Sequence, residues 1–239
     1  MLAIAFSELI QIFRNRLVLV TSLVMPVAVS AFFIYQHETF AAIGSLGYIA
    51  AVVVFTVGAF GLYTTTVTTL ASRRQNLFLK RLRSTSASDG GILAGLLLPI
   101  TVITLVQAAV ILTVLATVTG GPGNAVLLAV AVVAMVGMML GLGLATAGVT
   151  NSPEHAQVTT LPISIGSIAV ASWVGITGTE ELTLLKRMLP GGSATELIMN
   201  AWNGGVAMAD SLLLLAPTLA WVVVAVSLAS RFFRWEPRR

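Results

Sequence analysis

The sequence predicts an all-α membrane protein with six transmembrane helices. Hydrophobic residues make up 57% of the 239 residues and charged residues only 9%, whereas a soluble domain carries about 25% charged residues. Uncharged apolar stretches recur along the whole chain, and nearly every cation lies in one of three short segments that flank them, residues 14–16, 73–83 and 231–239. Such a chain has too few polar groups to cover a surface in water, so we expect one transmembrane domain over residues 1–239.

An N-terminal amphipathic helix is expected over residues 4–16. Its apolar positions recur near helical spacing, at Phe6, Leu9, Ile10 and Phe13. Its polar positions fall largely on the opposite side, at Ser7, Glu8, Gln11, Arg14 and Asn15. A helix with this pattern lies in the plane of the membrane interface, and we expect it on the inner leaflet.

Six apolar stretches are long enough to cross a bilayer. A helix needs roughly 20 apolar residues, at a rise of about 1.5 Å each, to cross about 30 Å of hydrocarbon. The stretches that qualify are residues 17–35, 42–71, 92–118, 125–149, 158–176 and 208–230. The second is longer than a crossing requires, so it is expected to tilt or to extend into water.

The cations predict the orientation of these spans. If both termini are cytosolic, eleven of the 13 cations lie inside: Arg14, Arg16, Arg73, Arg74, Lys80, Arg81, Arg83, Arg231, Arg234, Arg238 and Arg239. Only Lys186 and Arg187 then lie outside. Cytoplasmic loops carry an excess of Lys and Arg, so we expect both termini in the cytosol. The same arrangement explains the basic charge through lipid headgroups and orientation, without nucleic acid.

The connector between the fifth and sixth spans, residues 177–205, is the longest outer segment. Its apolar residues indicate one short helix before Leu189 and a second around Leu197–Trp202, with a break at Leu189–Gly192. Neither helix is long enough to cross the bilayer. We therefore expect two short re-entrant or amphipathic helices that dip into the outer leaflet.

The connector between the second and third spans carries the most informative pattern, over Arg73–Asp89. One side of a short helix there would be lined by Leu77, Phe78 and Leu82, with Leu79 as a further candidate and basic groups at the other positions. Topogenic charge and lipid binding explain the arginines. They do not require the ordered apolar positions or the Ser/Thr-rich exit, so a protein-docking surface stays open as the second interpretation.

Several kinds of chemistry are not indicated by the sequence. The only lysines are Lys80 and Lys186, and neither follows a glycine, so the chain has no P-loop and any ATP hydrolysis belongs to a partner. There is no cysteine, and His37 and His155 would lie on opposite sides of the membrane. We therefore expect no catalytic residue, no metal and no cofactor bound by this chain.

Polar residues inside the spans have two interpretations. The threonines of the second span are expected mainly to bond to their own helix, although Thr65 and Thr68 are candidates for lining a translocation pathway. Gln107 is a lone amide, and an interhelical hydrogen bond is favoured over contact with cargo. The glycines of the fourth span indicate close helix packing within the chain. Because the spans are nearly free of ionisable groups, coupling to an ion gradient is disfavoured.

One segment resembles a known family. Leu79-Lys-Arg-Leu-Arg-Ser-Thr-Ser-Ala-Ser88, between the second and third spans, is similar to the cytosolic loop of type-2 ATP-binding-cassette (ABC-2) exporter permeases. The resemblance extends over nearly the whole chain through the order of its elements, including Thr160-Leu-Pro-Ile163 in the fifth span, Leu189-Pro-Gly191 in the outer connector and the basic C-terminus. The chain lacks the proline that the family often carries near Ser86.

The resemblance implies a function and a set of site residues. The chain would be the permease subunit of an exporter in the bacterial cytoplasmic membrane, with ATP and Mg on separate ATPase subunits. The coupling helix that docks on an ATPase would comprise Asn76, Leu77, Phe78, Lys80, Arg81, Leu82, Arg83 and Ser84. The outer gate would include Leu189, Pro190, Gly191 and Trp202.

The resemblance also implies partners and a class of cargo. Two permease chains, identical or different, would enclose one pathway, with the first and fifth spans at their interface. The cargo would be amphipathic, drug-like or lipid-like, as in multidrug or antibiotic efflux. A gradient-driven transporter or channel without an ATPase is the alternative function, and a non-transporting scaffold or sensor is a third.

Overall fold

The expectation of an all-helical chain is confirmed. The structure is a computed structural model that describes residues 2–236, so Arg238 and Arg239 of the expected inner cluster lie outside the described residues. The chain is 84% helical, and the described residues contain no strand.

The helices before the loop at residue 76 are α1 (Leu2–Arg14), α2 (Arg16–Leu19), η1 (Val20–Val24), α3 (Met25–Tyr35), α4 (His37–Ile43), α5 (Leu46–Thr56), η2 (Val57–Thr64) and α6 (Thr65–Gln75). The helices after it are α7 (Phe78–Arg83), α8 (Asp89–Thr119), α9 (Ala125–Val149), α10 (Pro153–Thr159), α11 (Leu161–Thr177), α12 (Thr183–Met188), α13 (Gly192–Asn203), α14 (Met208–Leu213) and α15 (Leu215–Phe232).

Five helical segments within residues 2–236 are long and apolar enough to cross a membrane. They are Leu46–Gln75, Asp89–Thr119, Ala125–Val149, Pro153–Thr177 and Met208–Phe232. A sixth crossing exists only if Val20–Tyr35 and His37–Ile43 count as one span, and these two helices are bent by 77°. The apolar helices give the chain the character of a membrane protein, as expected.

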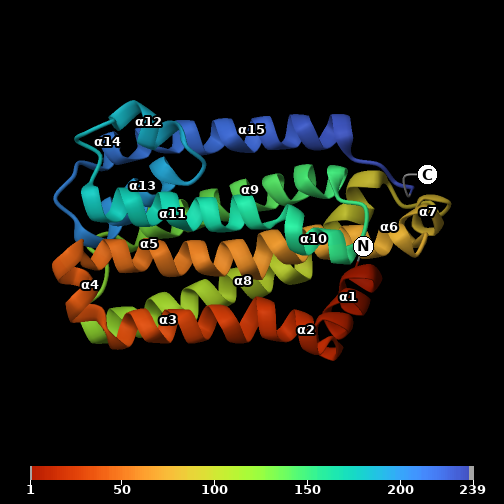
Figure 1. Ribbon diagram of the computed structural model, residues 1–239, viewed down its shortest axis with the longest axis horizontal. Coiled ribbons are helices and arrows are strands. Elements are labelled where there is room, and N and C mark those ends of the chain that lie inside the picture. The colour runs from red at the N-terminus through yellow and green to blue at the C-terminus, as the bar shows by residue number, and fades with distance from the viewer. Residues whose placement is uncertain (1, 237–239) are drawn as a thin grey trace.

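The long helices lie side by side in one elongated bundle (Figure 1). At one end of the bundle lie α1, α7 and the end of α15, and we call this the α7 end. At the opposite end lie α4, α12 and α14, and we call this the α12 end. Segments that are far apart in the sequence therefore meet at the same end of the molecule.

The helix Leu46–Gln75, formed by α5, η2 and α6, is the centre of the bundle. Every residue from Gly47 to Ala59 is buried. It is surrounded by α3, α8, α9, α11 and α13, all of which contact one of its three parts. The most deeply buried span therefore has little surface left for lipid, whereas the last span, which includes α15, keeps most of its surface exposed.

Glycines allow α9 to approach its neighbours closely, as the sequence pattern predicts. A methyl group added at Gly141 would lie 3.2 Å from the Cβ atom of Ala225 on α15. One added at Gly143 would lie 2.9 Å from Thr66 on α6. In lipid, where burial of apolar surface does not drive helices together, such close van der Waals packing is a main source of association.

The threonines of the central helix bond mostly to the same helix. The Thr64 and Thr65 hydroxyls donate to the carbonyls of Ala59 and Phe60, five residues earlier, at 2.9 and 3.4 Å. The Thr68 hydroxyl donates to Thr64 O at 2.8 Å. The five-residue spacing follows from η2, a π-helical stretch in which the backbone is wound more widely than in an α-helix. The favoured interpretation holds for Thr64, Thr65 and Thr68, whereas the buried Thr66 Oγ1 has no hydrogen-bond partner within the described residues.

The N-terminal helix differs from the expectation in its bounds and in its buried face. It runs over Leu2–Arg14, and α2 begins at Arg16. Phe6, Ile10 and Phe13 are exposed, whereas Glu8 is only 2% exposed. The polar side of an interfacial helix ordinarily lies toward water. Here α1 packs against α8 and turns its Glu8 side toward the protein, because Arg73 of α6 pairs with that carboxylate.

Candidate functional site

The candidate docking helix is shorter than the expected residues 76–84. Helix α7 contains only Phe78–Arg83, and Asn76 and Leu77 form the turn that precedes it. Leu77 adopts the left-handed conformation, with φ of 56°. This conformation costs a non-glycine residue roughly 1–2 kcal/mol. The turn thereby redirects the chain between α6 and α7 within two residues.

The apolar side of α7 differs from the expected one at Leu77. Leu79 is completely buried, and Phe78 and Leu82 are partly buried against the bundle. Leu77 is 47% exposed, so it does not share one side with Phe78 and Leu82 as expected. Leu77 precedes the first residue of α7 and has left-handed backbone, so the helical spacing used to align it with Leu82 does not apply.

Three cations point away from the bundle and form what we call the α7 surface: Lys80, Arg81 and Arg83, all exposed. Lys80 Nζ lies 3.1 Å from Glu236 Oε1, and Arg83 Nε lies 3.3 Å from Asp89 Oδ1. Exposed ion pairs of this kind contribute only about 0–1 kcal/mol. Carboxylates of another protein can therefore replace these partners at little cost.

The segment that follows α15 lies beside α7. The Arg83 guanidinium is 5.3 Å from the centre of the Trp235 ring, and Trp235 stacks edge-on against Phe233. Together with the Lys80–Glu236 pair, these contacts join the end of the chain to the α7 surface. The sequence places basic residues in both segments but contains no signal that they meet.

Arg74 has a different environment from the other cations of its cluster. It is only 3% exposed. Its Nη2 donates to the carbonyls of Ala147, at 2.7 Å, and Thr150, and its Nη1 donates to Arg234 O at 3.3 Å. A guanidinium at the C-terminal end of α9 complements both the free carbonyls and the helix dipole. Arg74 therefore joins the ends of α6 and α9 to the C-terminal segment.

Arg73 connects three helices at the same end. Its Nη2 lies 2.8 Å from Glu8 Oε2 and also donates to Gln11 Oε1, both on α1. Its guanidinium carbon lies 5.4 Å from the centre of the Phe78 ring on α7. The end of α6 is thereby tied to α1 on one side and to α7 on the other.

At the α12 end, both cations have structural partners. Lys186 is 2% exposed, and its Nζ donates to Thr177 Oγ1 at 2.8 Å and to Gly178 O at 2.7 Å at the end of α11. Arg187 donates two hydrogen bonds, of 2.7 and 2.6 Å, to the carboxylate of Glu196 on α13. These bonds raise the pKa of Arg187 above its ordinary value. They hold α12 against both α11 and α13.

The four candidate gate residues do not form one cluster. Leu189 and Pro190 are partly buried in the break between α12 and α13. Gly191 is buried, and a methyl group there would lie 2.8 Å from the Phe55 ring. Trp202 is buried at the other end of α13, roughly 16 Å away along the helix. Its carbonyl accepts a hydrogen bond of 2.9 Å from Gly123 N, in the connector between α8 and α9.

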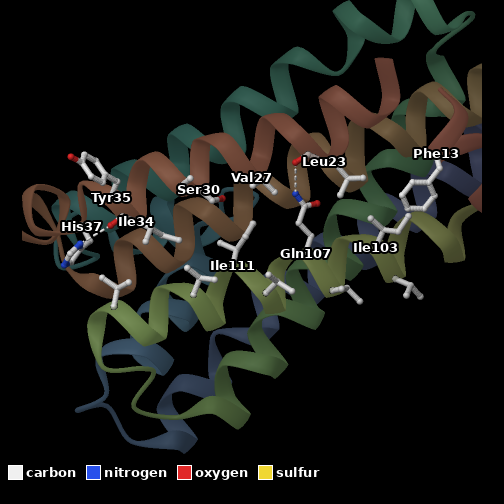
Figure 2. A pocket seen from close by; sticks show the side chains of 16 residues that line it. Phe13, Leu23, Val27, Ser30, Ile34, Tyr35, His37, Ile103, Gln107 and Ile111 are labelled. Carbon is white, nitrogen blue, oxygen red and sulfur yellow. Dashed lines mark hydrogen bonds between the residues drawn. The ribbon is translucent and has the colours of Figure 1, made fainter. Parts of the chain in front are cut away.

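An apolar groove lies between the N-terminal helices, mainly η1 and α3, and α8 (Figure 2). Its volume is about 830 Å³, and its walls are almost entirely apolar. Gln107 of α8 lies on this wall, and its Nε2 donates to Leu23 O of η1 at 3.2 Å. The predicted interhelical hydrogen bond is therefore confirmed.

The three candidate pathway residues lie in different places. Gln107 lines the apolar groove, whereas Thr68 lines a polar cavity of about 670 Å³ at the α7 end. Thr65 is buried inside the bundle. The structure does not bring them together along one cavity.

Comparison with known proteins finds neither a matching protein-family model nor a matching curated protein. Within residues 2–236, no group of three or more His, Cys, Asp or Glu side chains is arranged to hold a metal ion. The functional assignment therefore depends on the arrangement of helices and charges described above.

Proposed function

We propose that this chain is the permease subunit of an ABC-2 type exporter, and that a separate ATPase subunit docks on the α7 surface. The observation that carries the proposal is the distribution of buried apolar and exposed basic side chains on α7. Helix α7 is short and has a buried apolar side, and its other side presents three exposed cations at one end of a bundle of apolar helices. An acidic groove on a soluble subunit would complement this surface.

The position of the chain ends supports six crossings with both termini in the cytosol. Helix α1 and the end of α15 lie at the same end of the bundle (Figure 1), which supports an even number of crossings. Five long helices give an odd number, and Val20–Tyr35 with its bent continuation supplies the sixth crossing. The positive-inside rule then assigns the α7 end to the cytosol.

The connections of α7 supply a route for mechanical work. It follows α6 after a two-residue turn, and its other end leads to Ser88, which caps α8 by accepting a hydrogen bond from Gly91 N at 3.2 Å. Both neighbours are long helices of the bundle, and α6 continues through η2 into α5. Closure of two ATPase subunits would push α7, and the motion would pass to these helices as rigid elements.

The same proposal includes a second permease chain and an exit gate. Two chains, identical or different, would enclose the pathway for an amphipathic, drug-like or lipid-like cargo, with ATP and Mg bound by the partner subunits. Helices α12 and α13 would form the outer gate together with α11. Support for the gate comes from their position at the α12 end and from the two hydrogen bonds of Lys186 that anchor α12 to the end of α11.

The location of buried charge favours ATP-driven export over a gradient-driven transporter. Gradient-coupled transporters place ionisable groups within the membrane. Among the described residues, the buried charged side chains are Glu8, Arg74 and Lys186. Glu8 and Arg74 belong to the α7 end, and Lys186 belongs to α12 at the other end. None lies in the middle of a long helix.

Charge reversal of the α7 surface tests the proposal. We expect the triple variant Lys80→Glu, Arg81→Glu and Arg83→Glu to lower recovery of the ATPase subunit from native membranes by at least about 10-fold, since several charge pairs become repulsive. Recovery is measured by affinity purification of the permease and quantitative mass spectrometry. The control is Arg231→Glu with Arg234→Glu, which reverses two cations at the same end outside α7. Equal recovery of an ATPase with the triple variant and with the wild type would remove the docking assignment.

A further inference from the structure

A polar cavity of about 670 Å³ lies at the α7 end, between the N-terminal helices and the end of α6. Its wall includes Glu8, Arg14 and Arg16 from α1 and α2, and Thr68, Thr69, Ser72 and Arg73 from α6. It is distinct from the α7 surface and from the apolar groove. Thr68, a candidate pathway residue, lies on its wall, but the proposed docking surface and outer gate do not include it.

The cavity carries an excess of positive charge. Arg73 is paired with Glu8 at 2.8 Å, so these two charges cancel. Arg14 and Arg16 are both exposed, and neither forms an ion pair with any described carboxylate. Two guanidinium groups on the wall of one cavity, with no carboxylate of residues 2–236 paired to them, favour an anionic ligand.

Hydroxyl groups complete the polar wall. Within residues 2–236, the side chains of Thr69 and Ser72 form no hydrogen bond, although both are partly accessible. They are three residues apart on α6, so they lie on the same face of that helix. They can donate to phosphate oxygens or bond to the hydroxyls of a headgroup.

The helix beside the cavity presents an apolar face to its surroundings. Phe6 and Phe13 of α1 are more than half exposed, and Ile10, 42% exposed, also lines the cavity. A ligand held by Arg14 and Arg16 would thus have a charged group in the cavity and apolar surface beside it. This combination matches a phospholipid better than a soluble anion.

We propose that this cavity binds the headgroup of an anionic phospholipid from the leaflet at the α7 end. Arg14 and Arg16 bind the phosphate, Thr69 and Ser72 bind headgroup hydroxyls, and the acyl chains lie along the apolar face of α1. The Glu8–Arg73 pair closes the inner wall of the site and keeps α1 against α6.

Native mass spectrometry of the purified chain tests this site with two lipids. We expect dioleoylphosphatidylglycerol to bind about 10-fold more tightly than dioleoylphosphatidylcholine. Both lipids carry a phosphate, but the choline cation of phosphatidylcholine is repelled by Arg14 and Arg16 and offers no hydroxyl to Thr69 and Ser72. The variant Arg14→Gln with Arg16→Gln should lose this preference. Arg14→Lys with Arg16→Lys should retain most of it, and the control Arg231→Gln, an exposed cation at the same end, should retain all of it.

Two outcomes would overturn the proposal. One is equal preference for the anionic lipid in the Arg→Gln variant and in the wild type, provided that both elute as the same folded species. The other is displacement of phosphatidylglycerol by millimolar inorganic phosphate, which would assign the cavity to a soluble phosphate compound. Since the measurement requires neither an ATPase nor a cargo, its result is independent of the proposed export function.

Discussion

Replacement of Gly192 by alanine is expected to disrupt the junction between α12 and α13. A methyl group at this position would lie 1.7 Å from the carbonyl oxygen of Lys186, a backbone atom in the preceding helix. The neighbouring Gly191 has φ of 100° and is packed against Phe55, so the turn has no room to move away. We expect a loss of about 3 kcal/mol or more, or a fall of roughly 6–12 °C in melting temperature.

The matched control is Gly166→Ala. Gly166 lies within α11, and a methyl group there would meet no atom within 4 Å. Alanine in an open helical position is favoured over glycine by about 0.5–1 kcal/mol, so this variant should be unchanged or slightly more stable. Thermal unfolding in detergent, followed by size-exclusion chromatography, compares the two. A Gly192→Ala protein as stable as the control would show that the helices are not packed as described.

Substitution of Arg74 by methionine has the second large expected effect. Methionine preserves the apolar stem but leaves the carbonyls of Ala147 and Thr150 without their donor at the end of α9. Hydrogen bonds to charged groups contribute about 1.5–3 kcal/mol each, so we expect a loss of about 3–5 kcal/mol. Arg74→Lys should recover part of it, because an ammonium group reaches fewer of the three acceptors.

Two measurements identify the cause of this loss. Thermal unfolding gives its size, and limited proteolysis reports whether the segment after α15 is released when the bond to Arg234 O is lost. Arg81→Met is the control, since Arg81 belongs to the same basic cluster but is exposed. If Arg74→Met and Arg81→Met unfolded at the same temperature, Arg74 would have no structural role.

Local sequence signals were sufficient for most helices. A helix runs over Ala125–Val149, the residues expected for the fourth span, because Asn124 caps its start by accepting a hydrogen bond from Leu127 N at 2.9 Å. The break between α12 and α13 also lies where proline and glycine predict it. Such signals depend on neighbours in the sequence, so they can be read without knowledge of the fold.

The short helix α4 was not predicted, because its cause is tertiary. Residues 37–43 follow the first apolar stretch after a single intervening residue, without proline or glycine at the bend. The ring centres of Phe33 and Phe40 lie 4.4 Å apart, and Phe33 also contacts the ring of Tyr48 of α5 edge-on. These ring contacts hold α4 across the end of α3 at 77°.

The environment of each cation was the main feature that the sequence could not predict. Arg73, Arg74 and Lys80 form one basic cluster in the sequence, but their environments differ. Arg73 pairs with a buried carboxylate, Arg74 caps the end of a helix, and Lys80 points outward. Amphipathic spacing shows that a helix has two faces but not which face meets protein. In a membrane protein an apolar face can meet lipid, so the polar face of α1 is free to pack inward.

Photocrosslinking from α7 is the most direct test of the claim that this end of the bundle receives an ATPase. A photoreactive benzoylphenylalanine replaces Ser84, which is exposed at the end of α7, in cells that express the chain with its native neighbours. The same residue in place of Leu184, 78% exposed on α12, is the control. We expect the Ser84 position to crosslink to a subunit that carries a P-loop and the Leu184 position to form no such product. Absence of an ATPase from the Ser84 products, or its appearance only at Leu184, would contradict the account.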